Sequence, residues 1–88
     1  MQAPRLIQEV RPAYPVLAKQ TRTQGVVVLD CVIDQQGNVT QMKVVSGHPL
    51  LVPAAINAVR QWKYQPTLLN GEPVSVEMQV TVSFLMGS

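Results

Sequence analysis

The 88-residue sequence is poor in the side chains from which disulfide-rich and metal-binding domains of this size are built. It has one cysteine and one histidine, which excludes a disulfide framework, a Cys/His zinc site and a c-type haem. Only 5% of the residues are aromatic and 14% are charged. No apolar run approaches the roughly 18 residues of a membrane-spanning helix. The first residues also lack the charged start and apolar stretch of a signal peptide.

Apolar residues are present in quantity, at 47% of the chain, which is typical of a folded domain rather than a disordered segment. The length corresponds to a single small domain. We assign residues 11–86 to this domain and residues 1–10 to an N-terminal extension. The net charge is only +2, and the basic residues are scattered, so the sequence predicts no nucleic-acid binding.

Glycine and proline residues divide the chain into apolar stretches with distinct periodicities. Pro15 suits the start of a helix and Gly25 its end. The apolar stripe formed by Val52, Ala55, Ile56, Val59 and Trp62 predicts a second helix over residues 49–64, with Val52 standing where a polar cap is usual. β-branched residues predict strands over residues 26–34, 39–46 and 74–84, and Asn70-Gly71 predicts a tight hairpin turn.

These elements predict an α+β fold with two layers, in the order helix-strand-strand-helix-strand. We expect an antiparallel sheet of three to four strands with both helices on one face. The strand over residues 26–34 is placed centrally, so the last strand keeps one edge free. Such an edge invites pairing with another chain unless it is covered. Residues 6–10 alternate weakly in polarity and are a candidate cover for an edge.

No set of residues meets the geometric needs of catalysis. The sole His48 lies in a predicted turn and is interpreted as a solvated loop residue rather than part of a triad. Asp30 and Asp34 lie four positions apart on a strand, hence about 13 Å, and the carboxylates of glycosidases are closer than that. Cys31 falls on the inward face of its strand and is interpreted as a small buried apolar residue. The sequence therefore predicts a domain that is not an enzyme and that uses no metal, cofactor or small-molecule substrate.

Several motifs in order resemble the TonB C-terminal domain family. They are the start Arg11-Pro12-Ala13-Tyr14-Pro15, the turn Asp34-Gln35-Gln36-Gly37, the segment Trp62-Lys63-Tyr64-Gln65-Pro66 and the terminal strand Val80-Thr81-Val82-Ser83-Phe84. The resemblance covers roughly residues 5–86. It implies a periplasmic domain of an energy transducer in a Gram-negative bacterium. Members carry an inner-membrane helix and a proline-rich spacer upstream, so we expect this chain to be one domain of a membrane-anchored protein.

The resemblance also implies partners. Members bind the TonB box, a short extended peptide of outer-membrane transporters, by adding it as a strand to the last strand of the sheet. The residues before the first helix touch the transporter plug, and the ExbB–ExbD motor engages parts outside this chain. Carried over by position, the strand-binding residues are Val80, Thr81, Val82, Ser83 and Phe84. The plug-contacting residues are Arg11, Pro12, Ala13 and Tyr14.

Two other functions use the same fold and remain open at this point. One is a periplasmic scaffold or sensor-associated domain that serves no outer-membrane transporter. The other is a homodimer in which the free edge pairs with a second copy or exchanges strands with it.

Overall fold

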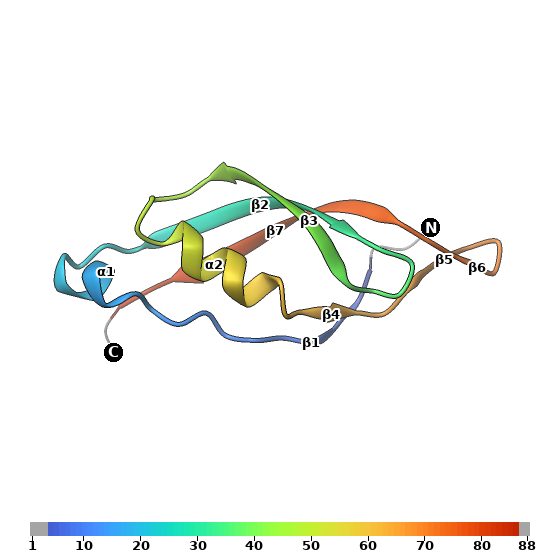
Figure 1. Ribbon diagram of the computed structural model, residues 1–88, viewed down its shortest axis with the longest axis horizontal. Coiled ribbons are helices and arrows are strands. Elements are labelled where there is room, and N and C mark those ends of the chain that lie inside the picture. The colour runs from blue at the N-terminus through green and yellow to red at the C-terminus, as the bar shows by residue number, and fades with distance from the viewer. Residues whose placement is uncertain (1–3, 87–88) are drawn as a thin grey trace.

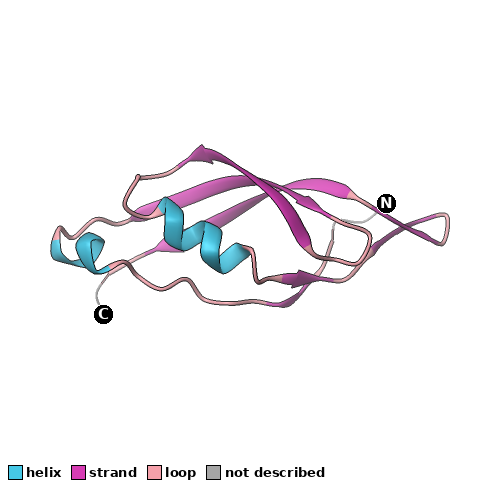
Figure 2. Cartoon of the chain, in the orientation of Figure 1, coloured by secondary structure: helices cyan, strands magenta, loops and turns pink. Residues whose placement is uncertain are grey.

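The computed structural model describes residues 4–86 and shows an elongated two-layer α+β domain measuring 49 × 23 × 17 Å (Figure 1). Its elements in chain order are β1 (Leu6–Gln8), α1 (Val16–Gln20), β2 (Gly25–Ile33), β3 (Val39–Ser46), α2 (Val52–Val59), β4 (Lys63–Tyr64), β5 (Thr67–Leu69), β6 (Glu72–Val74) and β7 (Val76–Phe84). Figure 2 shows that strands account for most of the regular structure and that the helices are short.

The main sheet has three antiparallel strands in the order β3-β2-β7, which confirms the central place of β2. Alternate residues of β2 and β7 point to the same side, so one face of the sheet is apolar. Ala18 of α1 and Ala55 and Val59 of α2 belong to the same buried cluster as Leu29 and Val82 of the sheet. Both helices therefore cover one face, as the sequence predicts (Figure 1).

The first helix is shorter than expected and does not end at Gly25. Pro15 has an extended backbone (φ −60°, ψ 139°) and serves as the N-cap rather than as the first helical residue. The helix stops because Arg22 adopts a left-handed conformation (φ 55°), after which the amide of Thr23 donates to the carbonyl of Ala18 at 2.8 Å. Gly25 is instead the first residue of β2.

The second helix was expected over residues 49–64 and occupies only Val52–Val59. Beyond Val59 the hydrogen bonds tighten: the amide of Gln61 donates to the carbonyl of Ala58, and that of Trp62 to the carbonyl of Val59. The chain then turns into β4, so Trp62 lies outside the helix. The expected helical stripe thus holds for its first four members and is wrong for Trp62.

The beginning of α2 has no side-chain cap, as expected, but the cap position is one residue earlier than the predicted Val52. Leu51 is the N-cap. A turn around His48 supports it instead, because the amides of Leu51 and Val52 both donate to the carbonyl of His48. The Nδ1 atom of His48 accepts a hydrogen bond from the amide of Leu50 at 3.0 Å. The sole histidine is thus an exposed turn residue.

The hairpin between β2 and β3 is closed by Asp34, whose Oδ1 accepts hydrogen bonds from the amides of Gln36 and Asn38, both at 2.9 Å. Gly37 in this turn has φ +88° and lies against β4, where the amide of Tyr64 donates to its carbonyl. A Cβ atom at Gly37 would stand 1.9 Å from the carbonyl oxygen of Tyr64. Only glycine fits this contact, which holds β4 against the hairpin.

The predicted strand over residues 74–84 is divided in two. Asn70 and Gly71 both have positive φ and connect β5 to β6 in a tight hairpin that projects from the domain, and β7 begins at Val76 (Figure 1). β1 pairs with β4, with Leu6 opposite Tyr64. Residues 6–10, the candidate cover for an edge, thus pair through β1 with β4 and not with a strand of the main sheet.

Candidate functional site: a groove beside the edge of β7

The outer edge of β7 is a regular extended backbone without a partner among residues 4–86. On its inner side β7 pairs with β2 continuously, from Gly25 opposite Phe84 to Ile33 opposite Val76, with no break in register. In an antiparallel pair every second residue directs its N–H and C=O away from the neighbour. The outer edge of β7 therefore presents a row of free donors and acceptors to solvent.

The side chains of β7 hold this edge in a fixed orientation. Val80, Val82 and Phe84 are buried in the core, with exposed fractions of 5%, 4% and 2%. Thr81 and Ser83 alternate with them and are exposed on the other face. Because the apolar side chains anchor the strand, only its main chain is available at the edge.

A groove of about 380 Å³ runs beside this edge. Its lining comes from the last part of β7, from Trp62 and from the irregular segment that joins β1 to α1. The lining residues are Glu9, Arg11, Pro12, Tyr14, Trp62, Thr81, Val82, Ser83, Phe84 and Leu85. We call the segment over residues 9–14 the wall of the groove.

Three kinds of contact hold the wall beside the domain. At its beginning, β1 pairs with β4, and the amide of Gln65 donates to the carbonyl of Arg5 at 2.7 Å. In its middle, the indole Nε1 of Trp62 donates to the carbonyl of Val10 at 2.8 Å. At its end, the hydroxyl of Tyr14 donates to the carbonyl of Thr23. The wall is thus tied down at both ends and once between.

Tyr14 also packs on β7 directly. Its ring meets that of Phe84 edge to face, with centroids 5.6 Å apart and an interplanar angle of 89°. This arrangement suits the opposite partial charges of a ring face and a ring edge. The contact joins the end of the wall to the end of the strand.

The structure brings together most of the residues that the sequence assigned to partner binding. Three of the four expected plug-contacting residues line the groove, together with residues 81–84 of the expected strand-binding set. Ala13 belongs to the same wall but does not line the groove, and neither does Val80, which is buried in β7. Both sets were carried over from the same resemblance, and members of both line one groove.

Sequence reasoning missed Trp62, Glu9 and Leu85 as lining residues. Trp62 was assigned to the helix stripe because its spacing from Val59 fits a helix. A signal was available in its chemistry, since a buried indole N–H needs an acceptor. The acceptor is 52 positions away in the sequence, at Val10, and sequence spacing cannot identify it.

The charges of the groove are few and of both signs. Glu9 and Arg11 are both exposed and stand two positions apart on the wall. The opposite side of the groove, over residues 81–85, carries no charged side chain. The groove therefore offers main-chain polar groups and aromatic surface more than an electrostatic field.

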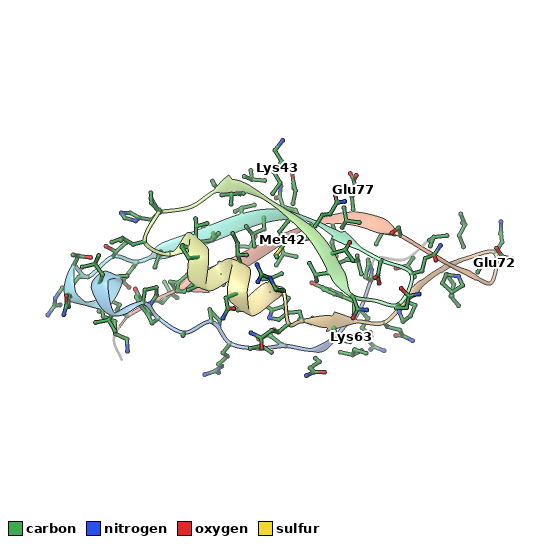
Figure 3. The ribbon with its side chains drawn as sticks, in the orientation of Figure 1. Met42, Lys43, Lys63, Glu72 and Glu77 are labelled. Carbon is green, nitrogen blue, oxygen red and sulfur yellow. The ribbon has the colours of Figure 1, made fainter. Side chains whose placement is uncertain are left out.

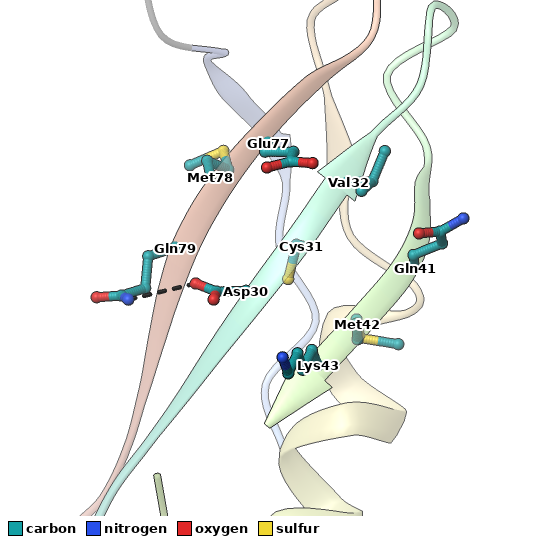
Figure 4. A pocket seen from close by; sticks show the side chains of 9 residues that line it. All are labelled: Asp30, Cys31, Val32, Gln41, Met42, Lys43, Glu77, Met78 and Gln79. Atoms are coloured by element: carbon teal, nitrogen blue, oxygen red, sulfur yellow. Dashed lines mark hydrogen bonds between the residues drawn. The ribbon is translucent and has the colours of Figure 1, made fainter. Parts of the chain in front are cut away.

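A second depression, of about 510 Å³, lies across β2, β3 and β7 (Figure 4). Among its lining residues, Asp30 accepts a hydrogen bond from the Nε2 atom of Gln79 at 3.3 Å. Lys43 and Glu77, also labelled in Figure 3, come from the two outer strands of the sheet. No group of three or more His, Cys, Asp or Glu residues suited to a metal ion occurs within residues 4–86.

Cys31 is a core residue rather than a nucleophile. Its side chain is 1% exposed. Burial raises the pKa of its thiol, and the negative charge of Asp30 raises it further, so the thiolate is disfavoured. The pKa of Tyr64 is also raised, mainly by burial, with smaller effects from Cys31 and Glu9.

Comparison with known proteins identifies relatives for almost the whole chain. Residues 10–86 match the family described as Gram-negative bacterial TonB protein C-terminal. Protein TonB of Vibrio cholerae is 32% identical over 78 residues, covering 86% of this chain and 32% of the relative. Protein TonB of Xanthomonas campestris is 35% identical over 77 residues, covering 85% of this chain and 34% of the relative. The chain thus spans about a third of the length of these relatives.

The fold also has a solved counterpart. The solution NMR structure of the Pseudomonas aeruginosa TonB CTD superposes with a TM-score of 0.80, covering all of this chain and 91% of that one, at 18% sequence identity. This likeness confirms the α+β architecture. In the part of the chain that the structure describes, no helix is long and apolar enough to cross a membrane.

Proposed function

Because the chain belongs to the family of Gram-negative TonB protein C-terminal domains, we propose that it binds an extended peptide of an outer-membrane transporter along the free edge of β7. The peptide is the TonB box of a TonB-dependent transporter. The observation that carries the proposal is the groove of about 380 Å³ beside an unpaired, continuously registered strand. In this role the domain acts in the periplasm and is not an enzyme.

Strand addition explains how one domain serves several transporters. The peptide exchanges main-chain hydrogen bonds with β7, which every sequence provides, and its alternate side chains meet the groove. About five such bonds at roughly 0.5–1.5 kcal/mol each would give modest affinity after the cost of ordering the peptide is subtracted. The complex is therefore reversible, as a coupling that must form and release requires.

The arrangement also suits the transmission of force. A peptide paired along β7 and pulled along the strand direction loads its hydrogen bonds together rather than one after another. β7 itself is anchored by its pairing with β2 and by three buried side chains. Tension therefore passes from the peptide into the middle of the sheet rather than into a loop.

The proposal also gives a role to the wall of the groove. Arg11, Pro12 and Tyr14 line the groove together with the end of β7, and Arg11 and Ala13 are exposed. In this proposal residues 11–14 contact the transporter plug next to the bound peptide. Anchoring in the inner membrane and contact with the ExbB–ExbD motor belong to parts of the full-length protein outside this chain.

The proposal is tested with TonB box peptides that are N-methylated on the backbone. In a strand added to β7, alternate residues direct their N–H toward the edge and the others away from it. Methylating two residues of the inward set removes about two hydrogen bonds and should weaken binding about 5- to 150-fold. Methylating two residues of the outward set is the matched control and should change the dissociation constant less than threefold. Equal effects of the two methylation patterns, or no binding of the unmodified peptide, would overturn strand addition.

The same free edge favours one alternative, pairing of two copies of this chain. Sedimentation analysis of the unliganded chain distinguishes the two. A mass that rises from monomer to dimer at micromolar concentration and falls when peptide is added indicates that the two compete for one edge. A mass that stays monomeric leaves the peptide as the partner.

A further inference from the structure

Trp62 occupies a special place in the groove, at the junction between α2 and β4. It is the only tryptophan of the chain. Its side chain is half-buried, lines the groove and donates its N–H to the carbonyl of Val10 at 2.8 Å. This bond crosses from the body of the domain to the wall, and among residues 4–86 it is the one hydrogen bond to the middle of the wall.

The wall needs such a bond because it has little structure of its own. Residues 9–15 connect β1 to α1 without helix or strand and do not pair with β7. A connection of this kind, fixed only at its two ends, samples many backbone conformations. Some of them bring the wall toward β7, and others move it away. The width of the groove therefore depends on whatever fixes the wall in the middle.

We infer that Trp62 is a positioning residue for peptide binding, which holds the wall at the distance from β7 that one added strand requires. A strand adds about 4.8 Å from the edge it pairs with, and its side chains need room beyond that. The indole has the size to act as a spacer and the N–H to act as a tether. The inference rests on the proposed function and goes beyond it, since strand addition by itself needs nothing but the edge.

A purely structural role for Trp62 makes a different prediction. An indole that only fills space contributes through its buried area, and its loss lowers the stability of the whole domain. A positioning indole acts through the N–H bond to Val10, and the loss of that bond changes the groove more than the core. The two roles separate when the N–H is removed while the ring is kept.

The test uses two variants of the 88-residue chain. In the first, Trp62 is replaced by 3-benzothienylalanine, in which sulfur takes the place of the N–H and the ring shape is kept. The second is Trp62→Phe, which is available by ordinary expression. Ile33→Val is the matched control, because it removes one methylene from a fully buried core position that does not line the groove. Affinity for the TonB box peptide, thermal midpoint and amide order parameters are measured for each.

We expect both Trp62 variants to bind the peptide about three- to tenfold more weakly, the equivalent of one lost hydrogen bond. The order parameters of the Val10, Arg11 and Ala13 amides should fall from values typical of rigid backbone toward those of flexible loops. Ile33→Val should lower the thermal midpoint and leave both affinity and order parameters unchanged. This split between affinity and stability is the signature of positioning.

The outcomes also separate this inference from the proposed function. If the unaltered chain binds the peptide and the benzothienylalanine variant binds it within twofold, Trp62 does not position the wall, and strand addition stands. If Ile33→Val weakens binding as much as the Trp62 variants do, the effect is one of stability, and the inference is again wrong. If the unaltered chain does not bind the peptide at all, both fail together.

Discussion

The main sheet has two outer edges, and they differ in regularity. β7 pairs with β2 from end to end without a break, whereas the register between β3 and β2 shifts between Val28 and Leu29 and again between Val32 and Ile33. Register shifts of this kind twist a strand and interrupt its row of main-chain groups, and proteins use them to protect edges. One edge is thus protected by its own geometry, while the other has an unbroken register and lies beside a groove.

The two outer strands also differ in how many of their side chains are buried. β7 buries Val80, Val82 and Phe84, whereas β3 buries Val39 at its start and leaves Val44 and Val45 exposed at 42% and 50%. β7 therefore has more buried side chains than β3 to anchor it in the core. An edge that receives a partner under tension needs such anchoring.

The largest expected effect is a loss of stability when a buried side chain that anchors β7 is removed. Phe84→Ala should lower the free energy of unfolding by about 3–5 kcal/mol, because a fully buried ring is lost together with its contact to Tyr14. Val44→Ala on β3 is the matched control and should cost well under about 1.5 kcal/mol at its half-exposed position. Urea unfolding followed by far-ultraviolet circular dichroism measures both. Similar losses for the two variants would show that the edges are anchored alike.

The next effect concerns the support of the wall. Gly37→Ala places a Cβ against the carbonyl of Tyr64 in β4 at a positive φ, and β4 carries β1 at the start of the wall. We expect a loss of about 2–4 kcal/mol, combining backbone strain with displacement of β4. Gly71→Ala is the control, since it has a similar φ of +82° but open space around it, and should cost about 1 kcal/mol. Equal costs would mean that the contact with Tyr64 is unimportant.

A smaller effect on stability is expected from Cys31 in β2, the strand between the two outer strands. Because the pKa of the Cys31 thiol is raised in the folded state, the unfolded chain releases this proton first as the pH rises. Stability should be unaffected well below pH 9.0, the ordinary value, start to decline as the pH approaches it, and fall further until the folded thiol also ionises. Cys31→Ala should flatten the decline between pH 9 and 10, before Tyr64 contributes in the same direction. An unchanged slope would show that another group is responsible.

The smallest expected effect compares the charges beside the two edges. Arg11→Gln, on the wall next to β7, should change the affinity for a TonB box peptide by no more than about fivefold, because exposed charges contribute at most about 1 kcal/mol. The change should shrink as salt is raised from 20 to 500 mM. Lys43→Gln on β3 should leave affinity unchanged at every salt concentration. An equal response to both substitutions would remove the distinction between the edges.

Much of the fold was predictable because local chemistry and tertiary structure agree. β3 has the predicted bounds, since β-branched residues follow a turn in which Asp34 and Gly37 have the required side chain and conformation. The end of α2 was not predictable. Trp62 fits the helical spacing, yet the chain leaves the helix because Gly37 offers its carbonyl to the amide of Tyr64. A contact between positions so far apart in the sequence outweighs local periodicity there.

The groove was predictable only in part. The resemblance supplied residues 11–14 and 80–84 as two separate sets, and their arrangement across one groove required the path of the chain around α1. Glu9 and Trp62 were missed because their place depends on the pairing of β1 with β4 and on a bond between Trp62 and Val10. The alternation of apolar and polar residues along β7 predicted which of its side chains are buried. In a strand with one apolar face, only one orientation turns that face toward the core.

We propose that the partner binds to β7 and not to β3. The most direct measurement is a titration of the isotope-labelled 88-residue chain with a TonB box peptide, followed by backbone-amide chemical shifts. We expect the largest shifts in residues 78–85, smaller ones in the wall and the indole N–H of Trp62, and none in residues 39–46. Shifts centred on β3, or no shifts along β7 at saturating peptide, would contradict this proposal.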